Sequence, residues 1–125
     1  MTDQLEFDIS DGEALPETDS GCRPVSSHDL TEHDIESDTQ LFSALSNDTR
    51  YEILRLLSAA DREVCACELV DELAVNQSTT SRALSALYQA RLVDRRKDGR
   101  WRYYTTTSRA ETVLSAVDTT REERA

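Results

Sequence analysis

Two cysteines separated by one residue, Cys65 and Cys67, are the side chains with the clearest capacity for coordination chemistry. Thiolates bind soft ions, and closely spaced reduced thiols are candidate metal ligands. Residues two positions apart on an ideal helix point about 200° away from each other. We therefore expect one ion to reach both sulfurs only if the first helical turn distorts, and we expect the helix N-terminus to lower the thiol pKa. The alternative is that both cysteines are small buried hydrophobic residues.

A second group of polar side chains occupies one side of a helix that we predict from Gln77 or Ser78 to Ala90. Short donors and acceptors with one arginine, at the leading end of a helix, suit base edges and phosphates in the major groove. Free N–H groups at the helix N-terminus favour a phosphate. Taken alone, the same face could be an ordinary solvated surface. The candidate DNA-contacting residues on this helix are Gln77, Ser78, Thr80, Ser81, Arg82 and Ser85.

Basic residues also gather in a predicted β-hairpin. Residues 92–96 and 101–105 are rich in β-prone side chains, and residues 97–100 between them contain the hairpin signal Asp98-Gly99. The aromatic residues of this segment suit the hairpin core better than base stacking. Taken alone, the basic residues could simply protect an edge strand from aggregation. The candidate DNA contacts of the hairpin are Arg96, Lys97, Arg100 and Arg102.

Apolar residues at helical spacing predict the elements that position these groups. We expect helices from about Asp38, over residues 51–57 and 65–73, over the polar helix described above, and over about 109–117. Two helices joined by about three residues and followed by a basic hairpin form a winged helix-turn-helix. The sequence therefore predicts a mainly α fold with a β-hairpin wing. The predicted core residues of the two central helices are Ala66, Leu69, Val70, Leu73, Ala83, Leu84, Leu87 and Tyr88.

The charges of the chain are unevenly spread, which defines three regions. The net charge is −11, and residues 1–40 carry 12 acids against one base, Arg23. Residues 76–109 carry eight bases against two acids, a net of +6 that favours a polyanion partner. We expect residues 1–37 to be an acidic, mostly disordered tail. Residues 38–118 form the predicted DNA-binding domain, and residues 119–125 a charged end.

Several classes of protein do not fit this sequence. Three cysteines are an odd number for a disulfide framework, and no signal peptide or apolar run of about 18 residues is present. We expect a soluble, cytoplasmic protein with no membrane partner. No glycine-rich cofactor loop or Cys/His pairing accompanies the cysteines, so we predict neither an enzyme nor a constitutive cofactor.

Residues 41–105 resemble the ArsR-type family of metal-responsive winged-helix repressors. The segments LFSALSNDTRYEILRLL, EVCACELVDEL, NQSTTSRALSAL and LVDRRKDGRWRYY resemble, in order, the family's opening helices, cysteine signature, recognition helix and wing. The resemblance implies a homodimer on palindromic double-stranded operator DNA, formed through the Leu41 helix and the C-terminal helix. It also implies release from DNA when trivalent arsenic or antimony binds Cys65 and Cys67.

The sequence departs from the family pattern at the third thiol. A third cysteine of the signature would fall at Val70, so we consider Cys22 or a small thiol as the third ligand. No histidine follows His33, so the zinc site that some relatives have on the last helix is not expected. The alternatives are a regulator that responds to thiol oxidation or to no metal, and a protein-binding winged helix. A disulfide between thiols at this spacing is expected to be strained.

Overall fold

The computed structural model describes residues 23–25 and 28–124 of the 125-residue chain. Met1–Leu30 and Thr31–Ala125 form two separate units. Within the first unit, the Leu30 N–H donates to His28 Nδ1 at 3.0 Å. Most of the predicted acidic tail lies outside the described residues, and so does Cys22. The predicted fold class is confirmed by the second unit, which is mainly α with a β-hairpin.

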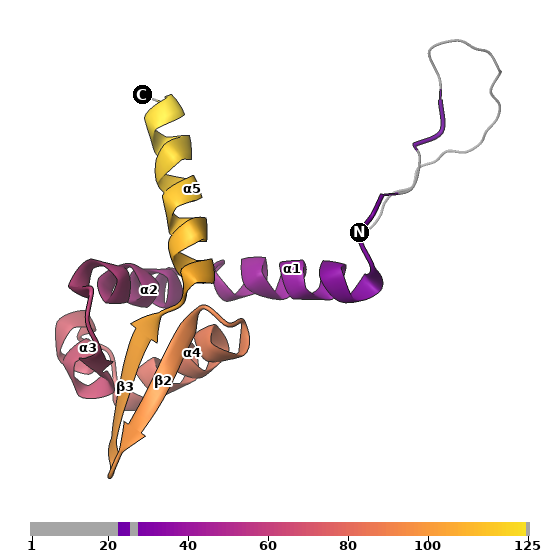
Figure 1. Ribbon diagram of the computed structural model, residues 1–125. Helices are drawn as coiled ribbons and strands as arrows, with labels where there is room; N and C mark the ends of the chain where they lie inside the picture. Colours follow the sequence, from indigo (N-terminus) through magenta and orange to yellow (C-terminus); the bar gives the residue numbers. More distant parts are fainter. Residues whose placement is uncertain (1–22, 26–27, 125) are drawn as a thin grey trace. The chain divides into compact units, whose positions relative to one another are not determined.

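Five helices and three strands make up the second unit (Figure 1). The helices are α1 (Glu32–Ala44), α2 (Asp48–Ala60), α3 (Ala66–Leu73), α4 (Gln77–Gln89) and α5 (Ser108–Arg124). The strands are β1 (Val64–Cys65), β2 (Val93–Asp98) and β3 (Trp101–Thr106), and they form one antiparallel sheet in the order β1-β3-β2. None of the helices among the described residues combines the length and the apolar character that crossing a membrane requires.

Helix α1 begins at Glu32, six residues before the predicted start at Asp38. Thr31 and Asp34 form a capping box: the Asp34 N–H donates to Thr31 Oγ1 at 3.0 Å, and the Thr31 N–H donates to Asp34 Oδ2 at 2.9 Å. This cap satisfies backbone groups that have no partner within the helix. The prediction was wrong at this point because it relied on apolar periodicity. Residues 32–37, assigned to the tail, are helical.

Helices α2, α3 and α4 build the core against the sheet. Asn47 caps α2 by accepting from the Arg50 N–H at 3.0 Å, and the helix buries an apolar stripe. Helices α3 and α4 are joined through Ala74, which has a φ of 55°. Asn76 caps α4 by accepting from the Thr79 N–H at 2.7 Å. The fully buried large side chains include Ile53, Leu54, Leu57, Leu84, Leu87, Leu92 and Val93.

Tyr88 is the clearest error in the predicted core. Its side chain is 39% exposed, and the guanidinium of Arg95 lies 4.0 Å from the centre of its ring. Tyr88 follows the buried Leu87, and the next buried position is Ala90. The aromatic ring therefore lies at the edge of the buried stripe, where a cation–π contact with the wing stabilises it.

The sheet differs from the prediction in two respects. Strand β1 was not predicted, since two residues are too few to show a period; Val64 pairs with Tyr104 and Cys65 with Tyr103. The hairpin turn has two residues instead of four, because Asp98 pairs with Trp101. Gly99 has a φ of +62°, as the first position of a tight hairpin turn can require.

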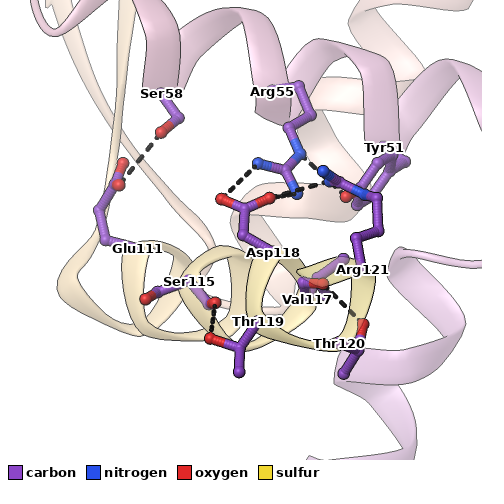
Figure 2. Close-up of polar contacts among 10 residues, drawn as sticks. All are labelled: Tyr51, Arg55, Ser58, Glu111, Ser115, Val117, Asp118, Thr119, Thr120 and Arg121. Atoms are coloured by element: carbon purple, nitrogen blue, oxygen red, sulfur yellow. Dashed lines mark hydrogen bonds and ion pairs between the residues drawn. The ribbon is translucent and has the colours of Figure 1, made fainter. Parts of the chain in front are cut away.

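Helix α5 packs on α2 through apolar and polar contacts. Ala110 and Leu114 are buried, and Arg55 of α2 donates to Asp118 at 2.8 Å (Figure 2). Ser58 of α2 donates to Glu111 of α5 at 3.1 Å, to one side of the Arg55–Asp118 pair (Figure 2). The helix continues to Arg124, past the predicted end at residue 117. The predicted charged end is therefore part of α5 as far as that residue.

Candidate metal and nucleic-acid sites

Cys65 and Cys67 converge at the start of α3. Cys65 is the N-cap of the helix, with extended backbone angles (φ −72°, ψ 141°), and Cys67 is the second helical residue. The two Sγ atoms lie 2.8 Å apart, and Cys65 Sγ accepts from the Cys67 N–H at 3.4 Å. The expectation that the sulfurs point to opposite edges was wrong because Cys65 is outside the helix. Both sulfurs can reach one ion without any distortion of the first turn.

The two thiols differ in exposure. Both thiols are free; Cys65 is only 8% exposed, whereas Cys67 is exposed to solvent. The alternative that both are buried hydrophobic residues therefore does not hold for Cys67. A ligand in solution meets the Cys67 thiol first, with Cys65 behind it.

Glu68 organises the backbone around this pair. Its carboxylate accepts from the Cys65 N–H at 2.9 Å and from Arg62 at 2.8 Å. The hydrogen bond from Arg62 is the main cause that lowers the pKa of Glu68. The arrangement is a capping box with cysteine in the place of serine, and the Cys-x-x-Glu spacing would have identified it in the sequence. We did not predict a role for Glu68 or Arg62.

The pKa of the Cys67 thiol is raised above its ordinary value. Its hydrogen bond to Cys65 is the main cause, followed by burial and by the negative charges of Cys65 and Glu68. The expected lowering by the helix N-terminus was therefore wrong for Cys67. The thiol keeps its proton more strongly, so binding a soft ion must displace that proton.

The described residues supply two soft ligands for one ion. Among residues 23–25 and 28–124, no group of three or more His, Cys, Asp or Glu side chains is placed to hold a metal. The two adjacent sulfurs suit a soft, thiophilic ion, and a third sulfur has to come from elsewhere. Cys22, the predicted candidate, lies outside the described residues.

A cavity of about 460 Å³ connects the cysteines to the two predicted DNA-contacting elements. Cys65 and Cys67 border it from the start of α3. Residues of helix α4 and of the hairpin also line it. The residues of these elements that border it include Gln77, Ser81, Arg100 and Arg102. A ligand bound at the thiols therefore lies next to groups that we predict to contact DNA.

Helix α4 exposes most of its predicted DNA-contacting face. The exposed members are Gln77, Ser78, Ser81, Arg82 and Ser85. Thr80 is only 1% exposed, and its hydroxyl donates to the Asn76 carbonyl at 3.2 Å. The prediction that Thr80 lies on the exposed face was wrong, because it lies one turn before Leu84 on the core side.

In the hairpin, Lys97, Arg100 and Arg102 are exposed, and Arg96 is held by an ion pair. Arg96 donates to both carboxylate oxygens of Glu63 at 2.8 Å and lies 4.9 Å from the ring centre of Tyr103. These hydrogen bonds from Arg96 lower the pKa of Glu63. No pattern in the sequence indicates this pair, because it depends on strand β1.

Comparison with known proteins establishes the family. Residues 47–95 match the model of bacterial regulatory proteins of the arsR family. The chain is 46% identical over 101 residues to the "Putative arsenical resistance operon repressor ArsR2" of Halobacterium salinarum, covering 81% of this chain and 83% of that protein. It is 47% identical over 87 residues to the "Putative arsenical resistance operon repressor ArsR" of the same organism, covering 70% and 67%.

Solved structures agree with this assignment. HlyU from Vibrio cholerae superimposes with a TM-score of 0.61 at 27% identity, over 70% of this chain and 94% of that one. The helix-turn-helix and the hairpin wing define a winged-helix DNA-binding regulator. The chain belongs to the arsR family of bacterial regulatory proteins. That family consists of regulators of transcription.

Proposed function

We propose that this protein is a homodimeric repressor that leaves its operator DNA when trivalent arsenic or antimony binds Cys65 and Cys67. The observation that carries the proposal is the convergence of two free sulfurs, 2.8 Å apart, beside the cavity that α4 and the hairpin share. The names of the two Halobacterium salinarum relatives, arsenical resistance operon repressors, support the choice of metalloid.

The position of each cysteine supplies a physical link between ligand and DNA. Cys65 pairs with Tyr103 in β3, so it belongs to the sheet of the wing. Cys67 belongs to α3, which the short turn at Ala74 connects to α4. A ligand that holds both sulfurs therefore fixes the wing relative to the helix-turn-helix. Release follows if the ligand binds this fixed arrangement more tightly than the arrangement that fits DNA.

The proposed dimer uses α1 and α5. Phe42 on α1 is 68% exposed and Ile35 is 42% exposed, an apolar surface that a monomer does not bury. Val113 and Val117 on α5 are half-buried. Arg109 at the start of α5 donates to Ser37 of α1 at 3.4 Å, which holds the two helices together at one end. A second copy that covers these side chains would present two α4 helices to a palindromic site.

Replacing both cysteines tests the sensing role. Cys65→Ser with Cys67→Ser should repress like the wild type, because neither thiol is on the predicted DNA-contacting face, and should not respond to arsenite. The measurement is expression of a reporter behind the protein's own promoter, with and without arsenite. A matched control is Ser46→Ala, which removes a hydroxyl far from the pair in sequence and should leave the response intact. Derepression of the double variant by arsenite would place the sensor elsewhere.

A second candidate is sensing of thiol oxidation. The spacing of the cysteines in the sequence led us to expect a strained disulfide. The N-cap geometry of Cys65 removes that objection, because it places the two sulfurs side by side. Two thiols that lose two electrons and two protons to an oxidant such as peroxide form a disulfide. Release from DNA by peroxide that a reductant reverses, with no response to arsenite, would favour this function over the first.

A further inference from the structure

The cavity beside Cys67 is larger than one ion requires. Its volume of about 460 Å³ falls in the range of small-molecule sites, roughly 300–1,000 Å³. Besides the two thiols it is bordered by Arg100, Trp101 and Arg102 of the wing, and by Asp71 of α3. The cavity therefore joins the cysteine pair to charged and aromatic groups of the kind that bind organic ligands.

The charges around the cavity define that ligand. Among the described residues, Arg100 and Arg102 form no ion pair, whereas the neighbouring Arg96 is held by Glu63. Guanidinium groups bind carboxylates through paired hydrogen bonds. Asp71 adds an acidic group that suits an ammonium. The wall is thus complementary to a small molecule that carries carboxylates and an amine.

The coordination of arsenic requires one more sulfur than the described residues supply. We propose that the cavity binds a small cysteine-containing thiol, whose sulfur joins Cys65 and Cys67 on one trivalent arsenic and whose carboxylates bind Arg100 and Arg102. This inference rests on the proposed function and names the third ligand. We prefer a thiol from solution to Cys22 as the third ligand, because the cavity has the volume and the charged groups that such a molecule requires.

The assembly is a ligand exchange without a change of oxidation state. In arsenous acid, As(OH)₃, three As–O bonds break and three As–S bonds form. The three thiol protons combine with the three departing hydroxides to give three molecules of water. No oxidant or reductant takes part.

The bound thiol also gives a reason for release from DNA. Its carboxylates would neutralise Arg100 and Arg102, two of the predicted DNA contacts in the wing, and it would lie against Gln77 and Ser81 of α4. Each lost phosphate contact weakens binding and reduces its dependence on salt. The same ligand would then both complete the arsenic site and block the DNA face.

Native mass spectrometry of the full-length Cys22→Ser protein tests this inference. The probes are arsenite with glutathione, which carries carboxylates and an amine, and arsenite with 2-mercaptoethanol, which carries neither. We expect one arsenic and one glutathione bound per protein chain, and much less of the mercaptoethanol adduct. Trp101 borders the cavity and is the single tryptophan, so its fluorescence should report glutathione binding to the arsenic-loaded protein.

Variants of the wing provide the control. Arg100→Ala with Arg102→Ala should weaken glutathione binding by about tenfold or more, since charge-assisted hydrogen bonds are lost. Lys97→Ala, a basic residue of the same hairpin that does not border the cavity, should leave that binding unchanged. Arsenic bound without glutathione, or a glutathione adduct indifferent to both arginines, would overturn this inference and spare the proposed function. A protein that binds no arsenic under any of these conditions would overturn both.

Discussion

At the scale of single residues, the backbone of Cys65 decides what the cysteine pair can do. Cys65 is an N-cap and Cys67 is helical, so side chains two positions apart meet instead of diverging. A regular helix through both positions would separate the sulfurs. The capping box with Glu68 holds this geometry.

Arg82 is the residue on which the predicted reading of DNA depends most. It is exposed on α4, and an arginine there can reach a base edge or a phosphate. Arg82→Ala should weaken operator binding by about 1–3 kcal/mol if it contacts a base, measured by gel-shift titration. Gln89→Ala, at the far end of the same helix, serves as the control and should bind normally. Unchanged affinity for Arg82→Ala would remove the recognition role of this face.

At the scale of elements, the sequence predicted the helices and the hairpin, which show a regular pattern, and missed the two-residue strand β1, which is too short to show one. The apolar stripes of α2, α3 and α4 and the Asp-Gly hairpin are visible as patterns, so the winged helix-turn-helix could be predicted. Strand β1 has two residues and forms only because β3 lies beside it. The pairing of Glu63 with Arg96 depends on that strand and could not be seen either. The burial of Thr80 could not be predicted either, because a polar side chain gives no sign that its position on α4 faces the core.

The attachment of α5 to α2 leads to a prediction about pH. The hydrogen bond from Arg55 is the main cause that lowers the pKa of Asp118 below its ordinary value of 3.8. A carboxylate with a lowered folded-state pKa stabilises the fold above its unfolded pKa, and this contribution disappears as the pH falls through the folded pKa. Asp118→Asn should therefore lower the free energy of unfolding at pH 7, by a small amount because solvent screens such an exposed pair.

Urea unfolding at several pH values measures this difference. The gap between Asp118→Asn and the wild type should close as the pH falls below 3.8. Glu122→Gln removes a carboxylate from the same helix and should differ little from the wild type at either end. A gap for Asp118→Asn that persists unchanged in acid would show that the ion pair with Arg55 is not its cause.

At the scale of the whole molecule, the opposite charges of the two regions suit a DNA-binding protein with an acidic N-terminal segment. Residues 76–109 keep a net charge of +6, although the whole chain has −11. Five of those eight bases lie in the hairpin and one, Arg82, lies on α4. Arg100 and Arg102 border the same cavity as the cysteine pair. The total charge therefore gives no guide to the partner of the folded unit, whereas its distribution does.

The proposed dimer leads to a prediction at the scale of the whole molecule. Phe42→Asp should shift the protein from dimer to monomer, because it places a charge in the proposed apolar contact of α1. Analytical ultracentrifugation measures the shift, and operator affinity should fall with it. Gln89→Asp adds the same charge to exposed α4 and should leave the protein dimeric. A Phe42→Asp protein that remains dimeric would contradict the role of α1.

The central claim is that the cysteine pair couples arsenic to DNA. The most direct test is the fluorescence anisotropy of an operator-length duplex from the protein's own promoter, bound by protein kept reduced with glutathione and titrated with arsenite. Our account predicts that anisotropy falls to that of free DNA with arsenite and stays high with zinc. DNA binding that ignores arsenite would contradict the account, leaving a winged-helix DNA-binding protein whose two cysteines do not sense arsenic.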